Sequence, residues 1–282
     1  MLADAARDPQ AIAARFVEAR RQGIALDSYP GAIPQSLDEA YAIQATAIAL
    51  RGGQIGGWKI GRINGAMVAT LGADRLAGPI FADLILEDDG TNTMPVIAGG
   101  FCAAEAEFLL RIGQRPDPAR TEWTLDDARA LVDRVAIGIE IASSPLATIN
   151  TLGPAVTASD FGNNHGLLVG PALPGWCDAD LDAIEVVVTI DGHEAGRATT
   201  ATMLDGPWGA VRFLVELCAR RGIALEPGQW ISTGAVTGVH EVVPGNRVEA
   251  SFDGLTFGCT IVADQASELA HDDARTDRRH GG

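Results

Sequence analysis

The chain has 282 residues, enough for one large domain or two small ones with a sizeable core. It carries 37 acidic against 21 basic residues, and the formal net charge of −16 argues against non-specific binding to nucleic acid or to anionic membranes. The opening MLADAARDPQ has neither the basic nor the apolar region of a signal peptide, and no apolar run approaches a membrane span, so we expect a cytoplasmic protein.

The first third of the chain is predicted to be mainly helical. Apolar side chains recur with a spacing near 3.6 over residues 9–23 and 36–51, which indicates two helices. Ser36 begins the second of them and Glu39 follows three residues later, as in a capping box. A glycine-rich segment with a short apolar strand at its centre comes next, and residues 64–72 are then predicted to form a short helix.

From residue 101 onward, strands are expected to predominate. The apolar segments FCAAEAEFLLRIG and VAIGIEIAS predict strands, separated by a helix in TLDDARALVDRV with Thr124 as its N-cap. A further helix, in GAVRFLVELCARRG, is expected to end at Gly222. Two Asp-Gly pairs between β-rich flanks, at residues 191–192 and 253–254, predict tight hairpins. Helices first and hairpin-linked strands later favour an α+β fold over a doubly wound parallel sheet.

The order of these elements divides the chain without a sharp boundary. We expect residues 1–75 to form a helical N-terminal portion that packs against a β-rich catalytic body of residues 76–263. The polar tail, residues 264–282, is predicted to be disordered.

Three glutamates stand in segments whose pattern otherwise predicts buried strand. Glu105 and Glu107 lie two residues apart, so on a strand they point to one face, and a neighbouring strand could bring in Glu140. Buried carboxylates are normally protonated, paired or bound to a cation, and an oxygen-only set suits Mg²⁺ or Mn²⁺. The alternative is a polar strand face for the first two and a core salt bridge for the third. We favour the metal site because of the third glutamate and because Arg75 is the only basic residue between Arg62 and the first glutamate.

Lys59 stands between Trp58 and Ile60 in the glycine-rich segment GWKIG. A lysine that loses solvation there has a lowered pKa and can transfer protons, which makes Lys59 a candidate catalytic residue. The alternative is a lysine on the exposed face of the strand, with its stem lying across the tryptophan ring. The residues alone leave both interpretations open.

Other polar residues are candidates for the site. Asp83, in GPIFADLIL, is either a turn residue or a catalytic acid near the site. Asn163, Asn164 and His165 precede an apolar strand, where such residues usually form turns, and they could also bind substrate in a polar pocket. The four cysteines form no C-x-x-C pair, and G-x-S-x-G and P-loop motifs are absent, which disfavours zinc, serine-nucleophile and nucleotide-phosphate sites.

The motifs GWKIG, GPIFAD, EAEFLL, GNNHGLLVG, GPWGAVRFL and STGAVTG occur in this order across most of the chain. Together they resemble the 2-oxopent-4-enoate hydratase family of the fumarylacetoacetate hydrolase superfamily. The resemblance implies a mixed β-roll or sandwich body with an N-terminal helical portion, Mg²⁺ or Mn²⁺ held by Glu105, Glu107 and Glu140, and a homo-oligomer. The implied substrate is a small molecule of aromatic catabolism, a 2-hydroxy-2,4-dienoate or its 2-oxo tautomer, which chelates the metal. Lys59 would shuttle protons, and water would add to the conjugated alkene to give a 4-hydroxy-2-oxo acid.

The sequence departs from this family at one informative place. Leu76 and Ala77 stand where the family commonly has an acidic residue and an aromatic, so water addition lacks one usual helper. The alternatives to hydration are decarboxylation of a 2-oxohex-3-enedioate, hydrolytic C–C cleavage of an acylpyruvate, and a non-catalytic partner subunit. For decarboxylation, Arg62 would suit a second carboxylate, although placement on the surface is the favoured interpretation of this residue. The lack of any histidine before His165 counts against hydrolysis, and the intact glutamates and Lys59 count against a non-catalytic subunit.

Overall fold

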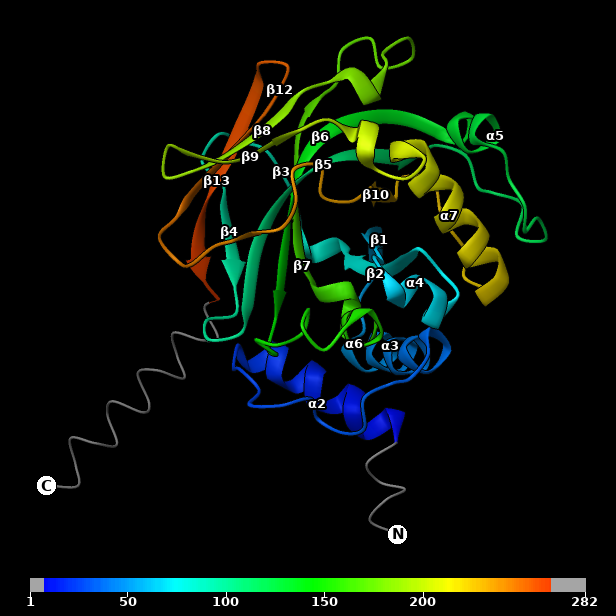
Figure 1. Ribbon diagram of the computed structural model, residues 1–282, viewed down its shortest axis with the longest axis vertical. Coiled ribbons are helices and arrows are strands. Elements are labelled where there is room, and N and C mark those ends of the chain that lie inside the picture. The colour runs from blue at the N-terminus through cyan, green and yellow to red at the C-terminus, as the bar shows by residue number, and fades with distance from the viewer. Residues whose placement is uncertain (1–7, 265–282) are drawn as a thin grey trace, which may run out of the picture.

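A computed structural model describes residues 8–264 as two β-sheets with helices around them (Figure 1). The strands of the larger sheet are β1 (Ile55–Arg62), β2 (Arg75–Phe81), β3 (Ile85–Glu87), β5 (Phe101–Ile112), β6 (Val132–Ser144), β7 (Asn164–Ala172), β10 (Trp230–Ser232) and β11 (His240–Glu241). Those of the smaller sheet are β4 (Thr93–Val96), β8 (Val186–Ile190), β9 (His193–Ala198), β12 (Arg247–Phe252) and β13 (Leu255–Ala263). The helices are α2 (Pro9–Gln22), α3 (Leu37–Arg51), α4 (Ala66–Leu71), α5 (Leu125–Ala130), α6 (Pro154–Ser159) and α7 (Gly206–Arg221), with short 3₁₀ helices η1 (Ala82–Leu84), η2 (Phe161–Asn163), η3 (Leu181–Ala183) and η4 (Thr200–Thr202).

Both sheets mix parallel and antiparallel pairs. The eight-stranded sheet has the order β2-β1-β10-β5-β6-β7-β3 with β11 beside β5, and the five-stranded sheet has the order β4-β13-β12-β8-β9. β1 pairs parallel with β10 and β3 with β7, whereas β5 and β6 form a long antiparallel pair. The predicted α+β class is therefore confirmed. The predicted disorder of the tail concerns residues that, Asp264 apart, lie outside the described part of the chain.

Local signals in the sequence produce the expected helix boundaries at several places. The side chain of Ser36 accepts a hydrogen bond from the Glu39 backbone N–H, 3.2 Å away, and so caps the first turn of α3. Gly222 ends α7 in the left-handed conformation, with φ of 66°, as the sequence predicts. These two residues therefore fix where α3 begins and where α7 ends.

The helix that Thr124 caps is shorter than predicted. Its capping box is complete, but α5 ends at Ala130, and the prediction that the helix reaches Val135 is wrong. From Val132 onward the chain is strand β6, because Val132 pairs with Ile112 at the far end of β5. Pairing along a long strand outweighs the helical spacing of a few apolar residues.

The two predicted Asp-Gly hairpins are present in the smaller sheet. Asp191 and Gly192, with φ of 53° and 80°, link β8 to β9, and Asp253 and Gly254, with φ of 47° and 84°, link β12 to β13. Consecutive positive φ values match the right-handed twist of the paired strands, which is why Asp-Gly is favoured there. The hairpins link neighbouring strands of the smaller sheet, which contacts β5 through β8 and β6 through β12.

The main core lies between the two sheets. Phe108 of β5 and Phe252 of β12 meet edge to face with ring centroids 5.1 Å apart, and both side chains are buried. This core holds β5 and β6 rigidly, so their opposite face offers a fixed base for polar side chains.

The first two helices pack at one end of the molecule. In Figure 1, α2, α3 and α6 lie together at the lower end, and α7 lies on another side. Ile12 and Phe16 of α2 are buried in a cluster with Tyr29, Phe81 and Phe161, so α2 covers the segment that leads into β7. β1 is a strand of the larger sheet although it lies within residues 1–75. Within the described residues, no helix combines the length and apolar character needed to cross a membrane.

Candidate metal centre and pocket

Three carboxylates meet at the centre of the larger sheet. Glu105 and Glu107 project from the same face of β5, and Glu140 on β6 stands directly opposite Glu105 in the strand register. One oxygen atom from each of the three lies within 4.8 Å of the other two, and all three residues are buried. Like charges directly opposite each other destabilise a sheet, so this register calls for a compensating charge.

The protein supplies only part of that compensation. Lys59 on β1 places its Nζ 3.2 Å from Glu140 Oε2, and this single ammonium faces three carboxylates. Asn164 Nδ2 donates to Glu140 Oε1 at 2.8 Å, and the Gly234 backbone N–H donates to Glu107 Oε2, also at 2.8 Å. Glu107 Oε1 is buried and has no hydrogen-bond partner among the described residues.

These features fit a divalent cation. An unpartnered buried carboxylate oxygen is costly, and an oxygen-only set within bonding reach of one point suits Mg²⁺ or Mn²⁺. Burial raises the pKa of Glu105 to about 7, although Lys59 acts in the opposite direction. Burial, together with the charges of Glu140 and Glu105, raises the pKa of Glu107 well above its usual value. Without a cation the cluster therefore holds protons that a metal ion would displace.

Lys59 is the only lysine in the 282-residue sequence, which otherwise uses arginine for its basic side chains. Its side chain is buried, in contrast to the alternative of a lysine on the exposed strand face. Burial lowers its pKa, but the charges of Glu140, Glu105 and Glu107 outweigh that effect and hold the pKa above its usual value. The predicted lowering of the Lys59 pKa is therefore wrong for the metal-free fold. Unlike an arginine, which is always charged, an amine at this position can both carry and release a proton.

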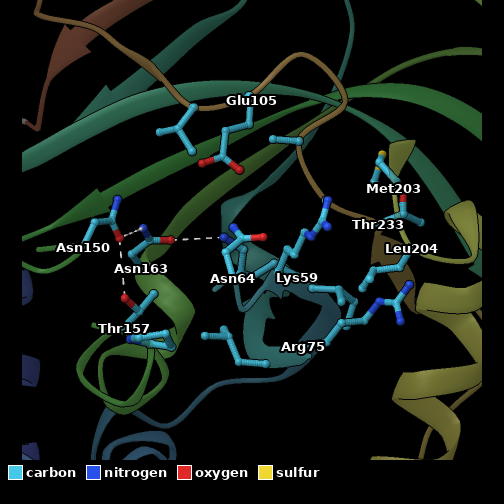
Figure 2. Close-up of a pocket in the computed structure, with 18 of the residues that line it drawn as sticks. Lys59, Asn64, Arg75, Glu105, Asn150, Thr157, Asn163, Met203, Leu204 and Thr233 are labelled. Carbon is cyan, nitrogen blue, oxygen red and sulfur yellow. Dashed lines mark hydrogen bonds between the residues drawn. The ribbon is translucent and has the colours of Figure 1, made fainter. Parts of the chain in front are cut away.

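A pocket of about 880 Å³ opens onto Lys59 and Glu105. Figure 2 shows Glu105, Lys59 and Asn163 around the same hollow, with Arg75 and Leu204 at its other side. Glu105 is the only carboxylate among the described residues that line the pocket, and no histidine lines it. Around the pocket, large apolar side chains are exposed on separate elements: Met67, Leu152, Leu204 and Val239.

The structure separates the three residues predicted to bind substrate. Asn163 lines the pocket, and its Oδ1 accepts a hydrogen bond from Lys59 Nζ at 3.1 Å. Asn164 instead donates to Glu140, beneath the pocket wall. His165 lies outside the pocket, with Nδ1 3.2 Å from Arg20 Nη1, and burial lowers its pKa. Substrate contact is therefore open to Asn163 alone of the three.

Asp83 also lies away from the pocket. Its side chain is largely exposed and accepts two hydrogen bonds from Arg51 Nη2, at 2.9 and 2.8 Å. The short helix η1 turns Asp83 outward, away from the carboxylate cluster. The structure does not bring this predicted catalytic residue to the other candidates.

Several site residues were not singled out from the sequence. Ser232 donates from Oγ to Glu107 Oε2, and Asn150 accepts at Oδ1 from Asn163 Nδ2 at 3.2 Å. Ser232 lies in the segment STGAVTG, whose glycines and hydroxyl side chains are the sequence feature that could have indicated a site there. Residues 233–239 line the pocket. Asn150 lies in a loop before α6, and nothing in its local sequence distinguishes it from a turn residue.

Known proteins resemble the chain over most of its length. It is 29% identical over 250 residues to a 4-oxalocrotonate decarboxylase of Pseudomonas sp, covering 86% of this chain and 94% of that protein. It is 28% identical over 225 residues to 2-keto-4-pentenoate hydratase 2 of Dechloromonas aromatica (strain RCB), covering 77% and 83%.

Solved structures share the fold. The 4-oxalocrotonate decarboxylase from Pseudomonas putida G7, complexed with magnesium and adipate, superposes with a TM-score of 0.74 at 21% identity, over 90% of this chain and 97% of that one. The fumarylpyruvate hydrolase from Pseudomonas aeruginosa, in complex with Mn²⁺ and pyruvate, gives a TM-score of 0.55 at 18% identity, over 73% and 89%. The family described as Fumarylacetoacetate (FAA) hydrolase C-terminal matches residues 85–262, more than half of the sequence. The chain therefore belongs to the fumarylacetoacetate hydrolase family.

Proposed function

We propose that this protein is a metal-dependent hydratase that adds water to a 2-hydroxy-2,4-dienoate and gives a 4-hydroxy-2-oxo acid. One observation carries the proposal: three buried carboxylates and the only lysine of the chain meet where a pocket of about 880 Å³ begins. Curated relatives named 2-keto-4-pentenoate hydratase, 26–28% identical, support this reaction, and relatives named 4-oxalocrotonate decarboxylase, 24–29% identical, support the second candidate given below.

The residues can be given roles from their positions. Glu105, Glu107 and Glu140 would hold Mg²⁺ or Mn²⁺, the ions with which two structural neighbours are complexed. A divalent cation there would neutralise the substrate carboxylate and stabilise the negative charge that develops on the C2 oxygen. Lys59, held by Asn163, reaches the pocket and would carry the proton that leaves the C2 hydroxyl and is delivered to C5.

Water addition completes the reaction. The 2-oxo-3-enoate formed by that proton shift is electron-poor at C4, so the oxygen of water bonds to C4 and a proton reaches C3. Leu76 lies in the pocket wall, where the family commonly has an acid nearby, so the chain supplies no second carboxylate for this step among its described pocket residues. We expect Lys59 to serve both proton transfers.

The proposal is tested by incubating the purified protein and Mg²⁺ with 2-hydroxypenta-2,4-dienoate and following the loss of the dienol absorbance. We expect turnover that EDTA removes and that added Mg²⁺ or Mn²⁺ restores. Full activity in EDTA would contradict the metal-dependent reaction. The matched control is a protein in which Glu249, an exposed glutamate on β12, is changed to Gln.

A second candidate is decarboxylation of a 2-oxohex-3-enedioate, and Arg62 is the observation that favours it. Arg62 lines the pocket and donates from Nη1 to the Thr202 carbonyl at 3.2 Å, with no carboxylate partner among the described residues. By contrast, Arg75 nearby is paired with Asp205 and Asp74. A second carboxylate on the substrate would complement Arg62, and the electron pair left by CO₂ would enter the conjugated 2-oxo system. The magnesium- and adipate-bound neighbour is itself a decarboxylase.

The two candidates are separated by one pair of substrates. If the diacid is the substrate, Arg62→Met raises its KM about tenfold and leaves the KM for the five-carbon dienoate unchanged, because only the diacid reaches the guanidinium. CO₂ release distinguishes the products. A KM for the diacid that is the same in both proteins removes the reason for the second candidate. The predicted homo-oligomer stays a prediction, which light scattering on the purified protein would check.

A further inference from the structure

A buried ion pair joins the first described helix to the segment before β7. Arg20, near the end of α2, donates from Nε to Asp160 Oδ1 at 2.7 Å and from Nη2 to Asp160 Oδ2 at 2.9 Å. The side chains are 9% and 0% exposed. The two residues are 140 positions apart in the sequence, so this contact exists only because α2 packs on the body.

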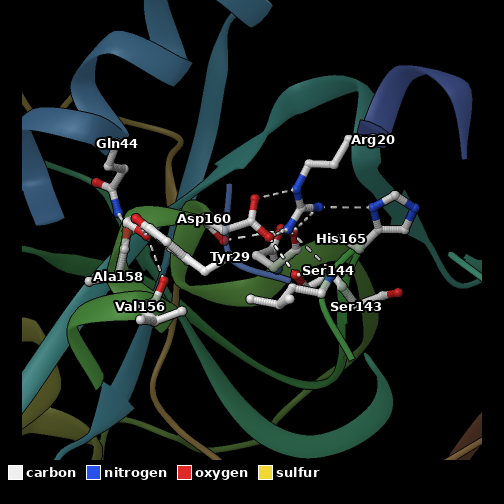
Figure 3. A network of polar contacts seen from close by, with 12 residues as sticks. Arg20, Tyr29, Gln44, Ser143, Ser144, Val156, Ala158, Asp160 and His165 are labelled. Atoms are coloured by element: carbon white, nitrogen blue, oxygen red, sulfur yellow. Dashed lines mark hydrogen bonds and ion pairs between the residues drawn. The ribbon is translucent and has the colours of Figure 1, made fainter. Parts of the chain in front are cut away.

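The remaining donors of Arg20 hold the same segment. Nη1 donates to the Asn164 carbonyl at 3.0 Å and Nη2 to the Ser143 carbonyl at 3.0 Å. Because a guanidinium only donates, His165 accepts at Nδ1 and carries its proton on Nε2, which faces Asp264 at 3.3 Å. Figure 3 shows Arg20 among Asp160, His165 and the two serines of β6.

The segment that Arg20 holds has an unfavourable backbone. Phe161, Gly162 and Asn163 have φ values of 54°, 65° and 60°, and two of these three are not glycine. The chain passes so close to β2 that a Cβ added at Gly78 would lie 2.0 Å from the Phe161 carbonyl oxygen. Such a conformation persists only when surrounding contacts fix it, and the Arg20 contacts act at both ends of the turn.

The turn delivers two side chains to the metal centre. Asn163 accepts from Lys59 Nζ at 3.1 Å, and Asn164 donates to Glu140 Oε1 at 2.8 Å. One residue therefore orients the ammonium and its neighbour orients a metal ligand. Arg20 touches neither Lys59 nor Glu140, and it binds the backbone that carries both asparagines.

We propose that the ion pair of Arg20 with Asp160 is a positioning device for the metal centre, so that docking of α2 sets the affinity of the three carboxylates for Mg²⁺ or Mn²⁺. This positioning role rests on the proposed function only in that a divalent cation is assigned to the glutamates. An ion pair that merely anchors α2 would change stability and leave the affinity of the folded protein for metal unchanged.

The test measures Mn²⁺ binding to the full chain by titration calorimetry, without substrate, for Arg20→Met and Arg21→Met. Arg21 is the matched control because it is the next residue of α2 and its ion pair with Glu18 is exposed. Residues that orient metal ligands change affinity about 10- to 100-fold, so we expect Arg20→Met to weaken Mn²⁺ binding by that factor and Arg21→Met to leave it unchanged. Equal affinity in both variants would overturn the proposal.

A double variant tests whether Arg20 affects the metal centre through Asn164. If Arg20 acts through Asn164, then Asn164→Ala weakens Mn²⁺ binding comparably, and the variant with both changes binds no more weakly than the weaker single one. Effects that multiply would show that Arg20 does not act by this route. Arg20→Lys keeps the charge and is expected to recover part of the affinity, which keeps the test decisive if Arg20→Met fails to fold. Wild-type protein that binds Mn²⁺ without acting on the dienoate would remove the proposed reaction and leave this inference standing.

Discussion

Two buried clusters of charge contact the same short segment, residues 160–165, and they are built in opposite ways. Around Asp160, one carboxylate meets one guanidinium, and the Ser144 hydroxyl donates to it at 2.6 Å. Around Glu140, three carboxylates meet one ammonium, and Glu107 Oε1 has no partner among the described residues. The first cluster is electrostatically complete, as a structural contact should be. The second lacks sufficient compensating positive charge, because the strand register places Glu105 opposite Glu140, and this deficit supports our proposal that a cation binds there.

Glu107→Gln is expected to have the largest effect, because it removes one of the three carboxylates from the cluster around Glu140. We expect this change to abolish turnover, since a ligand is lost, while the metal-free variant unfolds at a higher temperature than the metal-free wild type at pH 8. The reason is that a neutral amide costs neither the burial of a negative charge nor the uptake of a proton that Glu107 requires in the metal-free fold. Thermal unfolding with and without Mn²⁺ measures both effects, and Glu249→Gln on an exposed strand face is the control. Wild-type turnover in this variant would remove Glu107 from the metal centre.

Lys59→Met removes the single positive charge of the cluster around Glu140. We expect turnover to fall about 10²- to 10⁴-fold, because the proton carrier is lost, while the affinity for Mn²⁺ is kept or increased. Removing the ammonium removes a competitor for the carboxylates, which accounts for the second part. Steady-state kinetics at saturating metal and calorimetric titration give the two values. Weaker metal binding with unchanged turnover at saturation would overturn the proton-carrier role.

Asp160→Asn removes the counter-charge of Arg20 in the cluster around Asp160. We expect it to lower the stability of the protein, whereas Glu107→Gln is expected to raise that of the metal-free protein. Loss of one partner leaves a buried guanidinium without its counter-charge, and we expect the free energy of unfolding to fall by about 3–5 kcal/mol with or without metal. Urea denaturation measures it. Asp133→Asn, which opens the exposed pair with Arg111, serves as the control and should change little. A stability equal to the wild type would show that the two clusters are not different in kind.

The pH dependence of metal stabilisation sharpens the comparison further. Burial raises the pKa of Glu105 to about 7 in the metal-free fold, whereas an unfolded glutamate titrates near its ordinary value of about 4.3. Between these values the folded state binds more protons than the unfolded state, so its stability falls as pH rises, by about 3–4 kcal/mol across the interval. A cation replaces those protons, and the gain in melting temperature from Mn²⁺ should therefore grow between pH 5 and 8.

His165 must be separated from this effect. Burial lowers its pKa, so its contribution to stability increases as pH rises toward the ordinary histidine value, which is the opposite sign. His165 contacts Arg20 and Asp264 and none of the three glutamates, so its own titration moves both melting curves in the same direction. The difference between the two melting curves therefore isolates the carboxylates. A difference that stays constant with pH would contradict the raised pKa of Glu105.

The sequence predicts those parts of the site that follow from strand geometry. The two-residue spacing of Glu105 and Glu107 places both on one face of any strand, and apolar neighbours mark Glu140 as buried. For Lys59, the sequence left a buried and an exposed position open. The helix caps and Asp-Gly hairpins follow from equally local rules. Asp83 carries the same local signs, yet η1 turns it toward Arg51, and only the three-dimensional path decides that.

Contacts across long stretches of chain were beyond local reasoning. Arg20 meets residues more than 120 positions away, and Ser232 meets Glu107 from a similar distance. An arginine near the end of an amphipathic helix has an ordinary local explanation, since basic residues are favoured there. His165 was assigned to substrate binding because its neighbours are polar, but successive residues of a strand point to opposite sides. The strand register is needed to decide which of Asn164 and His165 points toward the metal centre.

The solitary lysine has a practical consequence for anyone handling this protein. Lys59 is buried and is the only lysine of the sequence. The outer surface therefore presents no lysine amine to aldehydes, active esters or 2-oxo acids. Lys59 lines the pocket, so formaldehyde that enters the pocket can reach it, and reductive methylation with isotopically labelled formaldehyde would give, apart from the chain terminus, a single side-chain resonance. That resonance would come from the centre of the molecule, and its position would report directly whether the neighbouring carboxylates hold protons or a cation.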